Sequence, residues 1–295
     1  MSEKKASALV IGASLCWGII GIFTRNLLAL GISSLEITFW RSIITAAAMI
    51  IMCLAKDRNL LKINKAKDIF YFIGTGICSI VFFNFCYFTS MQYLSLSSAC
   101  VLLYTAPAMV VIMSAFIFKE PVGRKKITAL IISFWGCVFM TGVLTGGQVT
   151  GKGILLGLGS GLGYSLYTVI GMAALKKYKV YTVITYTFII SSIALMPIGV
   201  KGGLPVGNAV GFIILMGLIS TFVPYLLYTK GLEFLEAGKA SIMAFFEPVM
   251  ATVIGVFIFR EYLTLANLLG IILIFASIVL LNNKAKNVSD SSEST

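Results

Sequence analysis

The chain has 295 residues, of which 59% are hydrophobic and only 12% are charged. Soluble domains carry about 25% charged residues, so this composition leaves too little polar surface for a water-soluble globule and predicts a membrane protein. The sequence has no His, which excludes imidazole as a base or metal ligand, and its six Cys show no CxxC spacing. We therefore predict neither a metal site nor a cofactor.

Apolar segments of about 18–25 residues recur along the chain, the length that a helix needs to cross the hydrocarbon of a bilayer. In order they are approximately residues 6–24, 35–55, 69–93, 97–118, 127–144, 154–175, 180–200, 209–229, 240–259 and 263–281. No small-residue cleavage pattern follows the first segment, so we predict a retained span rather than a removed signal. Because only helices satisfy every backbone group within lipid, the sequence predicts an all-α integral membrane protein with ten transmembrane helices.

The basic residues are distributed unevenly between the segments that connect these spans. If the N-terminus is cytoplasmic, 18 of the 23 Lys and Arg lie in cytoplasmic segments and four lie outside. This positive-inside pattern predicts a multi-pass protein of the plasma membrane with both termini in the cytoplasm. It also accounts for the net charge of +12 without a nucleic-acid partner. The polar, Ser-rich residues 283–295 are predicted to form a disordered cytoplasmic tail.

Two stretches of the sequence are related by a constant offset. Residues 100–120 read CVLLYTAPAMVVIMSAFIFKE and residues 241–261 read SIMAFFEPVMATVIGVFIFRE, so that an offset of 141 places Pro107 on Pro248 and Glu120 on Glu261. Five spans per half is an odd number, so the halves enter the membrane from opposite sides. We therefore predict two inverted five-helix repeats, at residues 1–145 and 152–282, with a substrate site between them as in secondary transporters.

These features resemble the drug/metabolite transporter superfamily, of the EamA type. The resemblance covers about residues 6–281 and includes the Trp17-Gly18 pair, Arg41 in the second span, and Leu94…Ala99 leading into the fourth span. It also includes a Pro followed about a dozen residues later by Lys/Arg-Glu, within the run Phe-Ile-Phe-Lys/Arg-Glu, at the end of the fourth and ninth spans. It implies secondary transport, often export, of small metabolites, amino acids or drugs through a central cavity lined by both repeats, and no enzyme activity.

Glu247 is the acidic residue that lies within a predicted span, since the other acidic residues fall in loops, tails or helix ends. A carboxyl at membrane depth is costly and usually faces a cavity or a partner, so Glu247 can exchange a proton during transport or bind a cationic group of the substrate. The alternative is a structural pair with Lys239 or Lys230. The repeat-equivalent position holds Ala106, so the fold does not need an acid there.

Arg41 is the corresponding cation, about two turns into the second span. Two interpretations stay open: a structural role with its head at the membrane surface, or an anchor for a substrate carboxylate. Pro107 and Pro248 each remove a helical hydrogen bond and predict helix breaks, which can act as hinges or as fixed kinks. Glu120 and Glu261 end the fourth and ninth spans, and we expect them to form helix-end pairs.

The remaining candidates are aromatic and amide side chains in spans that line the cavity of the family that the chain resembles. Tyr and Trp combine an apolar ring with a polar group, which suits a substrate with an apolar or cationic part. A buried amide must find a hydrogen-bond partner. With Glu247, the predicted lining of the substrate cavity is Trp17, Asn84, Tyr87, Tyr104, Tyr164, Tyr228 and Phe246.

The sequence thus predicts a secondary transporter, with export as the expected direction, for a small metabolite such as an amino acid or a related amphipathic compound. Its partners are this small molecule, the lipid bilayer and, if Glu247 titrates, protons, and a homodimer is left open. No Walker motif occurs, so ATP does not drive transport. The alternatives are a carrier of nucleotide sugars or sugar phosphates, a membrane-embedded enzyme and a channel. The anionic substrates would need several cations at depth, where the sequence offers Arg41.

Overall fold

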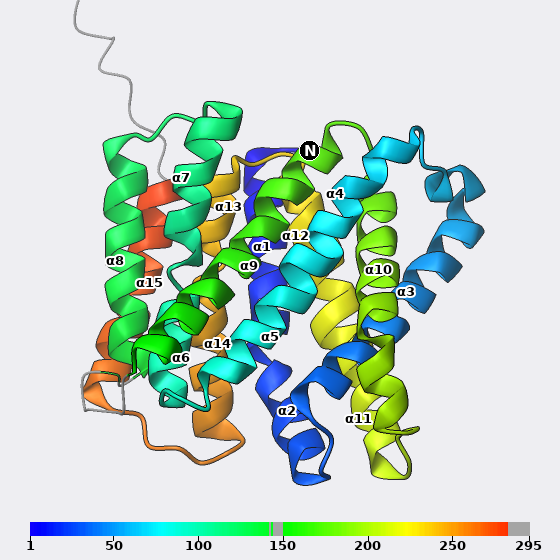
Figure 1. Cartoon of the computed structure of the whole chain (residues 1–295). Coiled ribbons are helices and arrows are strands. Elements are labelled where there is room, and N and C mark those ends of the chain that lie inside the picture. The colour runs from blue at the N-terminus through cyan, green and yellow to red at the C-terminus, as the bar shows by residue number, and fades with distance from the viewer. Residues whose placement is uncertain (142, 144–149, 283–295) are drawn as a thin grey trace, which may run out of the picture.

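The computed structural model describes residues 1–141, 143 and 150–282 (Figure 1). All regular elements in these ranges are helices. In the first half they are α1 (Glu3–Gly18), α2 (Ile20–Ala29), α3 (Ser34–Lys56), α4 (Ile69–Ile73), α5 (Phe82–Ser90), α6 (Leu96–Leu103), α7 (Ala106–Phe118) and α8 (Arg124–Thr141). In the second half they are α9 (Gly151–Leu175), α10 (Val180–Lys201), α11 (Asn208–Gly217), α12 (Val223–Leu232), α13 (Ala237–Met243), α14 (Phe246–Phe257) and α15 (Leu265–Asn282). The predicted tail, residues 283–295, lies outside the described residues.

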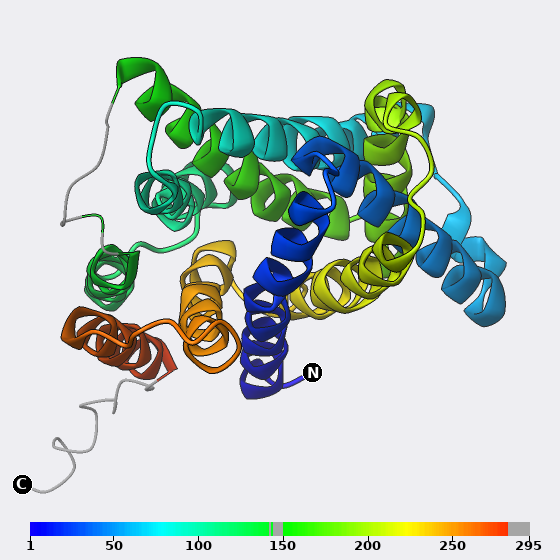
Figure 2. The ribbon, with the colours of Figure 1, turned by 90° about the horizontal axis from the view of Figure 1, so that it is seen from below.

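Nine helices among the described residues are long and apolar enough to cross a membrane, several of them built from consecutive shorter helices. The predicted all-helical membrane fold is therefore confirmed, whereas the tenth span stays a prediction. That span would be α8, whose 18 described residues begin with Arg124, Lys125 and Lys126. Three adjacent cations lower its apolar character, but α8 lies side by side with α15 over most of its length (Figures 1 and 2).

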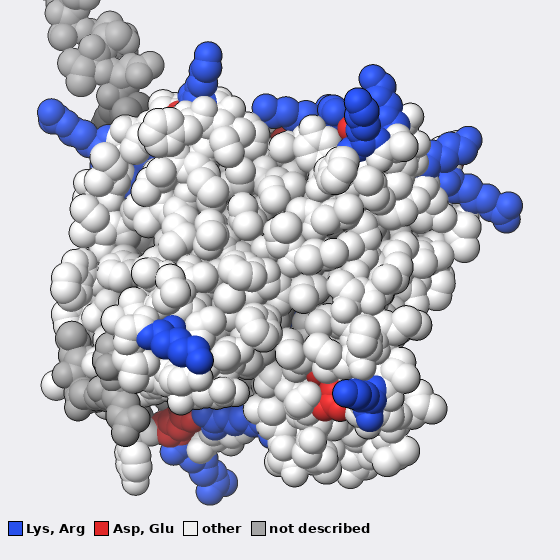
Figure 3. All heavy atoms as spheres, viewed as in Figure 1, with Lys and Arg blue, Asp and Glu red and all other residues white. Residues whose placement is uncertain are grey.

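The outer surface of the bundle matches a lipid environment. Large apolar side chains such as Phe116, Leu155 and Ile193 are well exposed, at 83%, 72% and 64% of their area. Figure 3 shows a pale belt across the side in view, with most Lys and Arg toward its two ends and more of them at the end that carries the N-terminus. We call that end the N-terminal face and the other end the opposite face.

Two kinds of interruption occur in both halves of the chain. A π-helical segment, Gly74–Val81, joins α4 to α5, and another, Leu218–Phe222, joins α11 to α12. The helix pairs α6/α7 and α13/α14 are each separated by a two-residue break. The second π-helical segment follows the first, and the second break follows the first, by close to the 141 residues that relate the two halves of the sequence. These breaks and π segments place side chains from the middle of the helices around the space described next.

Candidate functional site

One large cavity, of about 600 Å³, lies between helices from both halves of the chain. Its lining comes from α1, α2, α3, α5, α6, α9, α11 and α14, together with the start of α12 and the segments that follow α5, α6 and α14. The lining reaches Arg25 and Glu261, whose side chains are 54% and 50% exposed at the opposite face. On the N-terminal side the cavity ends against a tightly packed aromatic cluster, described below. The cavity is thus accessible from one face of the bundle.

Trp17 forms the inner end of this cavity, because α1 stops at the next residue and α2 begins in a new direction. The indole packs edge-on against Tyr225, with ring centroids 5.5 Å apart, and lies 5.3 Å from Tyr228. Gly18 lets α14 approach at this point, since an added Cβ would overlap the Cβ of Met250 and the backbone of α14. The predicted Trp-Gly pair therefore combines an aromatic wall with a close helix contact.

Arg41 projects from α3 into the lining and is only 7% exposed. Its Nη2 donates to Asn84 Oδ1 at 3.0 Å, and Asn84 in turn donates to the Ile80 carbonyl at 2.7 Å. Among the described residues the Nε of Arg41 has no hydrogen-bond partner, and no carboxylate pairs with this guanidinium. A buried cation with a free donor at a cavity wall can bind a carboxylate or another anion.

Glu247 also lines the cavity, in the first turn of α14, where the helix dipole favours a negative charge. The hydroxyl of Tyr164 donates to its Oε2 at 3.5 Å. The sequence left open a pair with Lys239 or Lys230, but Lys239 bonds to Glu3 at 2.8 Å and Lys230 lies over the Tyr181 ring. The carboxylate of Glu247 is therefore available to a ligand in the cavity.

The structure brings most of the predicted residues together, but two lie elsewhere. Trp17, Arg41, Asn84, Tyr87, Tyr104, Tyr164 and Glu247 all line the cavity. Tyr228 lies one layer behind it, at a void of about 10 Å³, where its hydroxyl pairs with Thr168 at 2.7 Å. Phe246 packs instead on Phe275 of α15, with centroids 5.0 Å apart. Its assignment to the cavity lining does not agree with this placement.

The two prolines lie where their helices restart. Pro107 is in the first turn of α7 and Pro248 in the first turn of α14, in each case just after the two-residue break. A Pro is well tolerated in a first helical turn, because its missing N–H would have no helical partner there. Both prolines lie behind the cavity wall rather than on it.

Sequence reasoning missed several lining residues, among them Thr38 and Phe83. Thr38 lies one helical turn before Arg41, so helical periodicity could have identified it. Phe83 directly precedes Asn84 and stacks edge-on against Tyr164, with centroids 5.7 Å apart. No local signal predicts the ion pair between Arg25 and Glu261, 2.7 Å long, which joins residues from the two ends of the chain.

Comparison with known proteins agrees with this architecture. The model of the EamA-like transporter family matches residues 4–142 and again residues 151–283. A protein of Archaeoglobus fulgidus described as an uncharacterized transporter is 30% identical over 284 residues, which cover 94% of this chain and 96% of that protein. The uncharacterized transporter YxxF of Bacillus subtilis is 25% identical over 289 residues, covering 95% and 90%.

A protein of known crystal structure has the same fold, with a TM-score of 0.83 at 17% identity over 95% of this chain and 97% of that chain. The family match and the relatives describe a transporter and not an enzyme. The chain thus belongs to the EamA-like transporter family of the drug/metabolite transporter superfamily.

Proposed function

We propose that the protein is a secondary transporter that moves a small amphipathic metabolite, such as an amino acid, through the 600 Å³ cavity by alternating access. The observation that carries this proposal is a large cavity whose inner wall, among the described residues, combines the cation Arg41 and the carboxylate Glu247 with aromatic side chains. Pockets of about 300–1,000 Å³ are typical for small-molecule ligands. A zwitterion can place its carboxylate on Arg41 and its ammonium group on Glu247, while its apolar part contacts Trp17 and Tyr164.

The proposed mechanism requires two inverted repeats, at residues 1–145 and 152–282, with α8 as the tenth span. The recurrence of the π segments and of the two-residue breaks in both halves supports this division. The distribution of Lys and Arg supports a plasma-membrane protein with both termini in the cytoplasm. In this orientation the cavity is accessible from outside, and rocking of the repeats would expose it to the cytoplasm.

Glu247 is proposed to couple transport to protons. Its carboxylate has a single weak protein contact in the described part of the chain, the 3.5 Å bond from Tyr164, so its charge must be stabilised by the substrate, a proton or water. A protonated Glu247 would release an ammonium group, and a charged one would bind it. With export as the direction of transport, protons would enter as the substrate leaves.

A nucleotide-sugar or sugar-phosphate carrier is the alternative within transport. Multiply charged phosphates call for a surplus of cations along the path. The charged residues that line the described cavity are two Arg and two Glu, namely Arg25, Arg41, Glu247 and Glu261. This balance favours a substrate that carries both signs of charge.

The test is uptake of radiolabelled amino acids into proteoliposomes, with and without a pH gradient. The unsubstituted protein is expected to show saturable uptake that the gradient stimulates. The Glu247→Gln variant is expected to lose the response to the gradient, whereas the control Glu233→Gln, an exposed position outside the cavity lining, is expected to keep it. The proposal is wrong if a broad panel of amino acids and other amphipathic metabolites shows no movement in either condition.

A further inference from the structure

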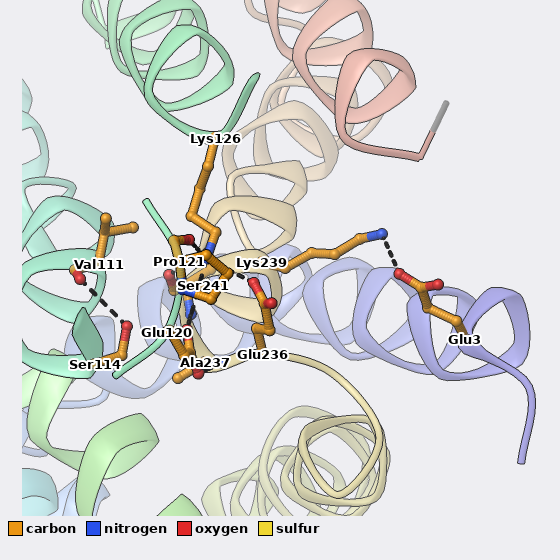
Figure 4. A network of polar contacts seen from close by, with 11 residues as sticks. Glu3, Val111, Ser114, Glu120, Pro121, Lys126, Glu236, Ala237, Lys239 and Ser241 are labelled. Atoms are coloured by element: carbon orange, nitrogen blue, oxygen red, sulfur yellow. Dashed lines mark hydrogen bonds and ion pairs between the residues drawn. The ribbon is translucent and has the colours of Figure 1, made fainter. Parts of the chain in front are cut away.

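On the N-terminal face a buried carboxylate joins the two halves of the chain. Glu120 accepts hydrogen bonds from the backbone N–H groups of Ala237 and Gly238, at 2.7 and 3.1 Å (Figure 4). These two residues begin α13, so the carboxylate lies at the positive end of a span from the other half of the chain. The Nζ of Lys126 lies 3.7 Å from Oε2 of Glu120 and 2.6 Å from Oε2 of Glu236. The side chains of Lys126 and Glu120 are only 9% and 8% exposed.

The backbone at the end of α7 aims this carboxylate. Lys119 has a left-handed conformation, with φ of 56°, which turns the chain back toward its helix. The N–H of Glu120 then donates to the carbonyl of Ser114 at 3.3 Å. A left-handed residue that is not Gly is costly, so other contacts must offset this cost, and the bond from the N–H of Glu120 is one of them.

The same turn occurs at the end of the ninth predicted span. Arg260 has φ of 55°, and Arg260 and Lys119 are the two non-Gly residues with positive φ in the described part of the chain. The N–H of Glu261 donates to the carbonyl of Gly255 at 3.0 Å. At the offset of 141, Arg260, Glu261 and Gly255 correspond to Lys119, Glu120 and Ser114 of the first turn. The chain therefore builds one carboxylate-presenting turn twice, once at each face.

In this structure the carboxylate of Glu261 does not bind the start of a helix as that of Glu120 does. The counterparts of Ala237 and Gly238 are Leu96 and Ser97, which begin α6. Glu261 instead pairs with Arg25 and is half exposed. Both Leu96 and Glu261 line the cavity, which thus separates the second carboxylate from the helix start that corresponds to its target.

We propose that Glu120 and Glu261 act as two alternating latches, that is, carboxylates that hold one face of the bundle closed. When the cavity closes at the opposite face, the carboxylate of Glu261 leaves Arg25 and accepts hydrogen bonds from the N–H groups of Leu96 and Ser97. Glu120 then releases α13, so the two latches alternate. This inference rests on the alternating access proposed above. Because each conformation gains the contact that the other loses, neither is strongly favoured, which is what repeated cycling needs.

The two latches differ in their basic neighbours. Lys126 supports Glu120 on the N-terminal face, whereas its repeat equivalent is the neutral Asn267, which bonds to Thr264 and to the Met140 carbonyl. Arg25 moreover competes for Glu261. The latch on the N-terminal face is therefore the stronger one, so we expect the molecule without substrate to favour moderately the conformation seen here.

Two pairs of introduced cysteines would report the two conformations. A Cβ added to Gly238 would lie 3.1 Å from Val111 Cγ2, so Val111→Cys/Gly238→Cys reports closure of the N-terminal face. The repeat-equivalent positions give Ser97→Cys/Thr252→Cys, which reports closure of the opposite face. Each pair is placed in a background whose six native Cys are replaced by Ala or Ser and whose transport is verified. The yield of disulfide after mild oxidation in proteoliposomes is measured by mass spectrometry.

Removing the charge of one latch should move the population toward the other. Glu120→Gln is expected to lower the yield of the Val111/Gly238 pair and raise that of the Ser97/Thr252 pair. Their ratio should shift about tenfold or more, since a charge-assisted hydrogen bond corresponds to about ten- to 150-fold. Glu261→Gln is expected to lower the yield of the Ser97/Thr252 pair. Glu233→Gln, an exposed acid at the end of α12, is the matched control and should change neither yield.

The outcomes separate the latch from the transport mechanism. If transport continues but the Ser97/Thr252 pair never forms, or forms equally with and without Glu261→Gln, then access alternates without this latch and the inference is wrong. If no substrate moves and neither yield responds to any variant, the proposed function itself fails. Should Glu120→Gln impair folding, the effect of Glu261→Gln on the Ser97/Thr252 yield still decides the question, because this position is half exposed.

Discussion

Replacing Arg41 with Met should separate binding from stability. The guanidinium is 7% exposed, and the described residues give it one hydrogen bond, to Asn84. If Arg41 has a structural role, its removal destabilises the fold. If it binds the substrate, the protein retains a costly buried cation for that purpose, and its removal relieves the cost. The two interpretations therefore predict changes of opposite sign.

The magnitude follows from the contacts. A hydrogen bond to a charged group contributes about 1.5–3 kcal/mol, whereas the desolvation of a buried ion costs several kcal/mol. Asn84 keeps a partner when Arg41 is removed, because its Oδ1 also accepts from the Thr38 hydroxyl at 3.3 Å. Replacing buried ionic groups with well-packed apolar ones is often stabilising by about 1–4 kcal/mol, so we expect Arg41→Met to raise the melting temperature in detergent.

Transport should change in the other direction. Loss of one charge-assisted contact to a substrate carboxylate, about 1.5–3 kcal/mol, weakens apparent affinity about ten- to 150-fold. Uptake in proteoliposomes measures this, and an amine that lacks the carboxylate should be affected much less. Arg58→Met, at an exposed position between α3 and α4, is the control and should change neither quantity. A clear fall in melting temperature, with uptake falling only in proportion to folded protein, would refute the reasoning.

Two further predictions concern the fold. Gly270→Leu should destabilise the protein by about 1–3 kcal/mol or more, because the new side chain would overlap the backbone of α8 at Gly136. Gly211→Leu should leave the stability unchanged, because nothing lies within 4 Å of a Cβ added there. The melting temperatures of the two variants measure this difference. A reporter protein fused to the C-terminus should be active only in the cytoplasm, and its appearance outside the cell would contradict the ten-span arrangement.

The sequence was sufficient to predict an all-helical membrane protein, its family and several of the residues that line the cavity, because long apolar segments and motifs such as Trp17-Gly18 depend on local sequence. Side-chain direction at a helix break does not. Phe246 and Glu247 were both assigned to the cavity, but consecutive helical residues point about 100° apart, so the two side chains face different neighbours. The rotation of α14 after the break points Glu247 into the cavity and Phe246 toward α15.

The π segments were equally unpredictable, since Gly74–Val81 reads as ordinary helix and its wider turn depends on packing. Gly76 within it approaches the carbonyl of Thr187 so closely that an added Cβ would lie 2.8 Å away. The pairing of Arg25 with Glu261 had no local signal either, because it depends on how helices from the two ends of the chain meet. Contacts between distant segments thus account for most of what sequence reasoning missed.

The approach of α14 to Gly18 also limits how the helices can move. The first two side-chain carbons of Met250 and the carbonyl of Glu247, both on α14, lie directly against Gly18 at this point. Any tilt of α14 against α1 must therefore leave this point nearly stationary, while the helix ends travel farthest. Gly18 would then be the pivot about which α14 tilts toward one membrane surface or the other. The inner wall of the cavity, formed by the adjacent Trp17, would keep its shape while the entrances open and close.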